Sequence, residues 1–406
     1  MHDITHFGLI VLVTACGFAA ALLAAKVSAR TPIPAAAIFL VAAALLSDAF
    51  PALELSTETV ERIATIALIV ILFDGGSSIG WRRFRVAAAP VTALGVVGTF
   101  ATAGAATLFV HWAFGLHWLL AGVLGAAVSP TDPAVMFSVL GEREISGRTG
   151  TILEGESGAN DPVGIALVLG LIQLAGHDHS SFWVVVRVFC EQMAIGLAIG
   201  VAGGLAEGQL MRRVSLPSSG LYTVRTLAGA GIIYGVATVA HGSGFLAVFV
   251  AGLIVGDVKA PFKAEIDLFQ EALSSVAEIV VFVALGLTVS LSSVGGDRWL
   301  EGMAIAAFLA LVARPLVVGA VLAPARLAAG ERLFVMWCGL KGAVPILLAS
   351  FALAEHVAEG QRLFEIVFVV VLASVVVQGG SIPLAARRFR VEMRRVAPTP
   401  RGARSA

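Results

Sequence analysis

The stretch 128–164 carries Asp132, Glu154, Glu156 and Asp161 on either side of a short polar turn, although strongly apolar sequence flanks the stretch on both sides. Placing one carboxylate at the centre of a lipid-embedded helix costs about 2.5–3.5 kcal/mol on insertion scales, so three or four cost about 10 kcal/mol. An ionisable residue inside a membrane is therefore by default part of a functional site. We expect the functional site of the protein to lie in this stretch.

The first half of the stretch predicts an interrupted helix. Pro130 and Pro133 each lack an N–H and free the carbonyl four residues earlier. Free carbonyls at membrane depth are tolerated only where they line a cavity or meet a partner. Thr131 and Asp132 lie between the prolines, so the segment offers carbonyls, a hydroxyl and a carboxylate, which are hard oxygen ligands for a small cation. A simple proline kink with a capping aspartate is the plainer alternative.

The second half predicts a helix with two polar faces. Ser157 and Asp161 are four residues apart and share one face, and Glu156 and Asn160 share another. Glu156 and Asp161 are five apart, so they cannot both point at one spot. We expect one of them to meet an ion while the other holds a structural partner. Pro162 follows directly and is expected to break this helix as well.

Buried carboxylates need counter-charges, and two basic residues lie deep in later apolar segments. Arg314 occurs in L-V-A-R-P-L and Lys341 in G-L-K-G-A-V-P. Either base could neutralise Glu156 or Asp132, and the sequence leaves this choice open. Pro345 frees the carbonyl of Lys341, which predicts a second interrupted helix.

These residues must be positioned by membrane helices. Of the 406 residues, 58% are hydrophobic and 13% are charged, whereas about a quarter of the residues of globular proteins are charged. The composition predicts an all-α polytopic membrane protein. Apolar runs that could span lipid number about 13, near 7–25, 33–47, 61–77, 87–110, 117–140, 152–174, 183–210, 222–240, 244–257, 270–291, 300–323, 333–354 and 363–386.

The distribution of basic residues predicts the orientation. Most of the 27 lysines and arginines fall in alternate loops and in the tail, whereas the opposite loops hold Arg62, Arg298 and Arg362. Cytoplasmic loops carry the excess of basic residues. We therefore expect a multi-pass cell-membrane protein with its N-terminus outside and its C-terminus in the cytoplasm. The basic tail, 391–406, is expected to be disordered and cytoplasmic.

A weak internal repeat supports a transport function. Pro133 and Pro345 occur at similar depth in related positions of the two halves, and F-D-G-G at the end of one span matches A-L-G-L at the end of another. An odd number of spans per repeat inverts the topology. Inverted repeats with paired, Pro- or Gly-broken helices are typical of transporters with a binding site at the midplane.

Three motifs in this order, S-P-T-D-P, E-x-E-S-G-x-N-D-P and G-L-K-G-A-V-P, resemble the NhaP-type branch of the monovalent cation:proton antiporters. The resemblance extends over nearly the whole chain. It implies an inverted-repeat antiporter fold with two crossed discontinuous helices in a single domain, 1–390. A core bundle (about 87–174 and 300–386) would move against a scaffold bundle (about 7–77 and 183–291), which would also form a homodimer.

The resemblance also implies roles for individual residues. Asp161 would hold the proton and the cation in alternation, and Thr131, Asp132, Ser157 and Glu156 would be further cation ligands. The supporting residues would be Asn160, Arg314, Lys341 and Asp74. The asparagine before the key aspartate implies electroneutral exchange. The family has arginine where this chain has Lys341, which keeps the charge but loses the rigid two-pronged donor. Which of Arg314 and Lys341 pairs with Glu156 stays open.

The expected function is exchange of Na⁺, K⁺ or Li⁺ for H⁺ by competition at Asp161, with alternating access. No cofactor, no metal other than the alkali cation and no nucleic-acid partner is expected. One alternative is a cation-coupled symporter of small organic anions, which would need a roomy cavity with uncharged polar residues. Another is an intramembrane aspartyl protease with Asp74 and Asp161 as its dyad. The role of Asp74, as a gate charge or as a plain interfacial residue, stays open, as does that of Glu278.

Overall fold

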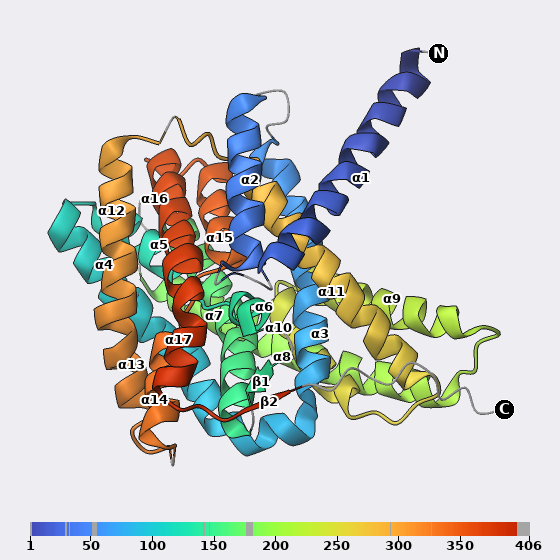
Figure 1. Cartoon of the computed structure of the whole chain (residues 1–406). Coiled ribbons are helices and arrows are strands. Elements are labelled where there is room, and N and C mark those ends of the chain that lie inside the picture. Colours follow the sequence, from blue (N-terminus) through green and yellow to red (C-terminus); the bar gives the residue numbers. More distant parts are fainter. Residues whose placement is uncertain are drawn as a thin grey trace.

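The computed structural model describes residues 2–28, 31, 33–50, 55–140, 143–145, 147–175, 182–292, 294–325 and 327–395 (Figure 1). Apart from two short strands, the regular structure of these residues is helical. The helices are α1 (His2–Ser28), α2 (Ala35–Ala49), α3 (Thr57–Thr92), α4 (Thr99–Phe114), α5 (Trp118–Ala127), α6 (Ala134–Leu140), α7 (Arg148–Ala175), α8 (Trp183–Arg213), α9 (Ser219–Val239), α10 (Gly244–Gly256), α11 (Lys263–Gly286), α12 (Gly296–Phe308), α13 (Arg314–Val321), α14 (Ala329–Trp337), α15 (Ala343–Ala354), α16 (Gly360–Ala373) and α17 (Gly380–Arg388).

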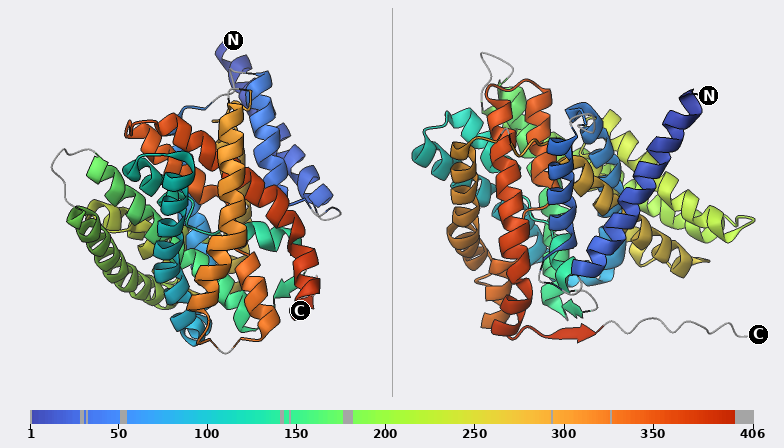
Figure 2. Two further views of the ribbon diagram at one scale, coloured as in Figure 1. Left: turned by 90° about the vertical axis from the view of Figure 1, so that its left-hand side faces the viewer. Right: turned by 45° about the horizontal axis from the view of Figure 1, so that its top comes forward.

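The helices are those of a multi-pass membrane protein. Six helical stretches of the described chain are long and apolar enough to cross a membrane, and five further apolar helices have 10–17 residues. Each of the thirteen expected spans falls on one helix or on a consecutive set of helices. The expected all-α polytopic fold is therefore confirmed. In Figure 1, α12 and α16 lie on one side and α9 and α11 on the other, and Figure 2 shows α1 leaning out from the bundle.

Two expected spans meet within α3, which has a kink at Gly80. Gly80 leaves the helical conformation with φ 67° and ψ 156°, a left-handed region that favours glycine. The carboxylate of Asp257, which follows α10, accepts a hydrogen bond from the backbone N–H of Arg82 at 2.7 Å. This carboxylate therefore satisfies a free backbone donor at the kink.

The two predicted interrupted helices are present and cross at their breaks. The first consists of α5 and α6, separated by residues 128–133, and the second of α14 and α15, separated by residues 338–342. The backbone N–H of Asp132 donates to the carbonyl of Leu340 at 2.9 Å, which ties one break to the other. Pro130 and Pro133 lie in the first break, and Pro345 lies in the first turn of α15, where its missing N–H leaves no bond unmade.

Pro162 does not break its helix, contrary to expectation. The helix α7 continues from Arg148 to Ala175 with this proline inside it. Neighbouring helices surround α7, because it packs against α3, α5, α8, α10 and α15. Membrane helices tolerate an interior proline where such neighbours support the freed backbone group.

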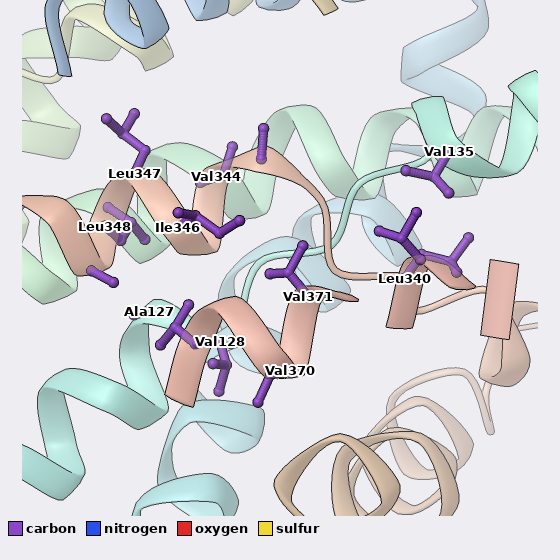
Figure 3. Close-up of a cluster of buried hydrophobic side chains, with 14 of the residues drawn as sticks. Ala127, Val128, Val135, Leu340, Val344, Ile346, Leu347, Leu348, Val370 and Val371 are labelled. Carbon is purple, nitrogen blue, oxygen red and sulfur yellow. The ribbon is translucent and has the colours of Figure 1, made fainter. Parts of the chain in front are cut away.

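Apolar side chains pack the region around the breaks. Figure 3 shows such a cluster, with side chains from α5, α6, α15 and α16 and from both breaks. Its labelled members are at most 3% exposed: Ala127, Val128, Val135, Leu340, Val344, Ile346, Leu347, Leu348, Val370 and Val371. Close packing of this kind has little room to adjust, so it holds the two breaks in a fixed relation.

The segment after α17 does not match the disorder expected from residue 391. Strand β2 (Met393–Arg395) pairs antiparallel with β1 (Arg143–Ile145), which connects α6 to α7. Backbone pairing with a partner strand fixes these three residues, and the sequence gives no periodic signal for so short a strand. Residues 396–406 lie outside the described part of the chain.

Candidate functional site

A cavity of about 240 Å³ lies where the first break and α7 face α3 and α11. The side chains of Asp161 and Ser157 line it from α7, in agreement with the face that these two residues were expected to share. Asp161 is only 5% exposed, and its Oδ1 atom has no hydrogen-bond partner among the described residues. An unpartnered carboxylate oxygen in a buried cavity is a ligand position for a proton or a cation.

The lining of the cavity is strongly acidic. The described residues that line it include no lysine or arginine. Five carboxylates face the cavity: Asp74, Asp132, Glu154, Asp161 and Glu278. A cleft of one charge sign with low-dielectric walls concentrates counter-ions. The cavity is therefore suited to cations and unsuited to anions.

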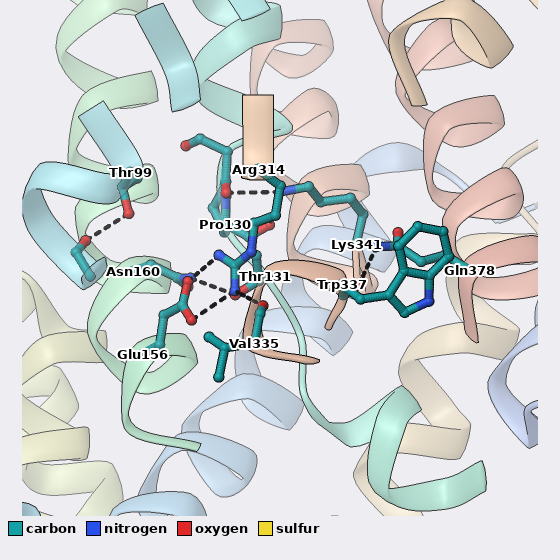
Figure 4. A network of polar contacts seen from close by, with 12 residues as sticks. Thr99, Pro130, Thr131, Glu156, Asn160, Arg314, Val335, Trp337, Lys341 and Gln378 are labelled. Atoms are coloured by element: carbon teal, nitrogen blue, oxygen red, sulfur yellow. Dashed lines mark hydrogen bonds and ion pairs between the residues drawn. The ribbon is translucent and has the colours of Figure 1, made fainter. Parts of the chain in front are cut away.

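The other face of α7 holds an ion pair. Arg314 Nη2 donates to Glu156 Oε2 at 2.9 Å, and Arg314 Nη1 donates to Glu156 Oε1 (Figure 4). Arg314 Nη2 also donates to the carbonyl of Val335 in α14 at 3.1 Å. A Cβ on Gly339 would lie 2.6 Å from Arg314 Nε, so this glycine leaves room for the guanidinium.

This ion pair answers the open choice between the two bases. Arg314, and not Lys341, is the partner of Glu156. Both carboxylate oxygens of Glu156 bind the guanidinium, and the residue does not line the cavity. The expectation that Glu156 binds the cation is therefore not met, because its position on the helix turns it toward Arg314.

Asn160 connects α7 to the first break. Its Nδ2 donates to Thr131 Oγ1 at 2.7 Å, and both side chains are buried. The Thr131 hydroxyl therefore faces Asn160 and is not part of the cavity lining. The pair holds the break against the helix that carries Asp161.

Lys341 binds backbone carbonyls. Its Nζ donates to the carbonyl of Ser129 at 2.9 Å and to that of Pro130 at 3.0 Å. The carbonyl of Ser129 is one of those that the prolines were expected to free, since Pro133 follows it by four residues. The other, at Ala126, accepts from the hydroxyl of Ser129 at 2.8 Å. An ammonium with three rotatable donors can bind two such carbonyls without the fork geometry of arginine.

A chain of side-chain hydrogen bonds supports the second break, and it was not foreseen from the sequence. The Ser374 hydroxyl accepts from the N–H of Lys341 at 2.8 Å and donates to Gln378 Oε1 at 3.1 Å. Gln378 Nε2 donates to the carbonyl of Trp337 at 2.6 Å. Ser374 and Gln378 belong to a π-helical turn, Ser374–Gly379, between α16 and α17. Single π-helical turns within α-helices are frequent at functional sites.

The opposite wall of the cavity contains residues that the sequence left undecided or missed. Asp74, on α3, does reach the cavity, and Ser274, on α11, lines the same cavity. Ser274 and Glu278 are four residues apart on α11, a spacing that marks a polar face on an otherwise apolar helix. Glu154, on α7, also lines the cavity and lies 3.7 Å from Arg83.

Comparisons with known proteins agree with this arrangement. The sequence model of the sodium/hydrogen exchanger transmembrane family matches residues 17–388. The K⁺/H⁺ antiporter NhaP of Alkalimonas amylolytica is 36% identical over 389 residues, which are 95% of this chain and 67% of that protein. The low-affinity Na⁺/H⁺ antiporter NhaS1 of Synechocystis sp. is 27% identical over 349 residues, 82% of this chain and 65% of that protein.

A solved structure shows the same fold. The sodium proton antiporter MjNhaP1 from Methanocaldococcus jannaschii superposes with a TM-score of 0.78 at 20% identity, over 94% of this chain and 99% of that one. The present chain spans about two thirds of the length of the curated relatives that it matches. The resemblance inferred from the three motifs is confirmed: the chain belongs to the sodium/hydrogen exchanger family.

Proposed function

We propose that this protein is a secondary transporter that exchanges a monovalent cation for H⁺ across a cell membrane. One observation carries the proposal: Asp161 is buried, keeps one oxygen without a hydrogen-bond partner, and lines a cavity of carboxylates. Relatives are named K⁺/H⁺ and Na⁺/H⁺ antiporters, so Na⁺ and K⁺ are the first cations to test, with Li⁺ as a third.

The exchange follows from two ligands that compete for one carboxylate. Desolvation favours the protonated form of a buried carboxyl group, whereas a dehydrated cation at the same oxygens favours the charged form. The hydroxyl of Ser157, one turn before Asp161, and the carboxylate of Asp132 face the same cavity and would complete the cation shell. A site that holds one ligand at a time, opened to each side in turn, gives obligatory exchange.

The ion pair on the other face of α7 supports electroneutral exchange. Arg314 neutralises Glu156, and the residue before Asp161 is the uncharged Asn160. Asp161 is then the carboxylate that alternates between H⁺ and a singly charged cation. Each cycle moves one charge in each direction.

Alternating access needs two bodies that slide past one another, and we assign them as a core bundle (about 87–174 and 300–386) and a scaffold bundle (about 7–77 and 183–291). The cavity lies between them, since α7, the first break and α15 line one wall and α3, α10 and α11 line the other. In the assigned orientation the N-terminus is outside and the C-terminus is in the cytoplasm. The scaffold bundle would also form a homodimer. The charge pattern of the loops supports the orientation.

Everted membrane vesicles from cells that lack their own cation:proton exchangers test the proposal. Addition of NaCl, KCl or LiCl should discharge an imposed pH gradient, read with a pH-sensitive dye, and Asp161→Asn should abolish the response. A symporter of organic anions would respond only when the anion is supplied. A pH gradient that persists in wild-type vesicles with all three cations would contradict the proposal.

A further inference from the structure

Glu278 faces the site from the opposite side of the cavity. It lies on α11, is half-buried and lines the cavity that Asp161 and Asp132 line from the other wall. Glu278 lies fifteen residues after the start of α11, about 22 Å along the axis, and Asp161 lies thirteen residues after the start of α7, about 20 Å. The two carboxylates therefore lie at similar distances along their helices, in the deep part of the same cavity.

Among the described residues, Glu278 has no basic side chain as a counter-charge. Among the described residues, no hydrogen bond or ion pair joins Glu278 to another side chain, and the charged group that acts on it is Asp132. The other titratable groups that line the cavity from neighbouring elements are also acids, namely Asp74 on α3 and Glu154 and Asp161 on α7. The unpartnered Oδ1 of Asp161 opens on the same space. Each of these carboxylates attracts a cation that enters the space between them.

The position of Glu278 also makes its effect depend on the side of the membrane. It belongs to the scaffold bundle, whereas Asp161 and Asp132 belong to the core bundle, in the division that the proposed function uses. When the core bundle moves, Glu278 keeps its place in the scaffold bundle. Its charge then attracts the cation only while Asp161 faces this cavity.

We propose that Glu278 is a further affinity-determining residue, a fixed carboxylate that strengthens cation binding on the side to which the cavity opens and leaves binding on the other side weaker. This inference rests on the proposed function. In the assigned orientation the cavity opens toward the cytoplasm, because its lining includes Ser78 and Glu154, near the Gly80 kink with its basic residues Arg82 and Arg83.

The test compares the KM for Na⁺ in everted and in right-side-out vesicles. Glu278→Gln should raise the KM about three- to tenfold in everted vesicles, as expected for the loss of one charge from a focusing cleft. The KM in right-side-out vesicles should change little. Glu278→Asp keeps the charge. It should restore most of the wild-type ratio between the KM in everted vesicles and the KM in right-side-out vesicles. Glu265→Gln, an exposed carboxylate on the same helix, is the matched control and should leave the ratio unchanged.

Wild-type protein gives a second readout that needs no variant. Choline chloride screens charges, so it should raise the KM for Na⁺ more in everted than in right-side-out vesicles. An unchanged KM ratio in Glu278→Gln, a rise of equal size in both orientations, or equal salt sensitivity in the wild type would overturn the inference. Wild-type vesicles that show no exchange at all would instead contradict the proposed function.

Discussion

Arg314 and Glu156 form a two-pronged ion pair inside the helix bundle, on a different face of α7 from the one that carries Asp161. Arg314 is 7% exposed and Glu156 is 2% exposed, so neither charge can be solvated if the other is removed. The pair also joins α7 to the start of α13 and, through Val335, to α14. It therefore fixes the helix that carries Asp161 while neither of its members lines the cavity.

Breaking this pair should destabilise the protein. Glu156→Gln or Arg314→Met should each lower the free energy of unfolding by about 3–5 kcal/mol, because each leaves an uncompensated buried charge. Thermal unfolding of the purified protein in detergent should show this as a lower Tm. The double variant Glu156→Gln/Arg314→Met should lose much less than the sum of the two, and strict additivity would contradict the assigned pairing.

The sequence predicted those parts of the site that depend on residue type and spacing along one helix. The prolines of the first break located the interruption, and the four-residue spacing of Ser157 and Asp161 placed both on one face. The choice between Arg314 and Lys341 could not be made, because it depends on which segments cross in space. For the same reason, the sequence alone does not assign a role to Glu278.

Lys341 should act on the geometry of the first break. Lys341→Met would leave the carbonyls of Ser129 and Pro130 without their donor, and each buried unsatisfied group costs about 1–3 kcal/mol. We expect a lower Tm and a lower Vmax in vesicles. Lys341→Arg keeps the charge and the donors and should recover most of the stability. Equal damage from both variants would show that the ammonium itself is required.

The contact between α7 and α10 should limit the movement of one bundle against the other. A Cβ on Gly158 would lie 2.6 Å from Phe249 Cδ2 and still closer to other atoms of that ring. Gly158→Ala should therefore lower the exchange rate at least severalfold, since overpacking costs about 1–3 kcal/mol. Adding Phe249→Leu should restore a large part of the rate. Gly104→Ala, at a position with open space around it, is the matched control.

Protons and cations should compete in the steady-state kinetics. As the pH falls, the protonated fraction of Asp161 rises and the fraction that can bind a cation falls, so the KM for Na⁺ should rise by up to about tenfold per pH unit. Vmax at saturating Na⁺ should change much less. Dye measurements in everted vesicles at several pH values provide this comparison. A Vmax that falls with acid while KM stays constant would indicate a separate regulatory proton.

Proton release on cation binding tests the central claim most directly. Purified protein in weakly buffered detergent solution receives NaCl, KCl or LiCl in turn, with choline chloride as the control for ionic strength, and a pH indicator reports the protons released. The account predicts about one proton per bound cation in the wild type and none in Asp161→Asn. Cation binding by the wild type without proton release, or equal release by Asp161→Asn, would contradict it.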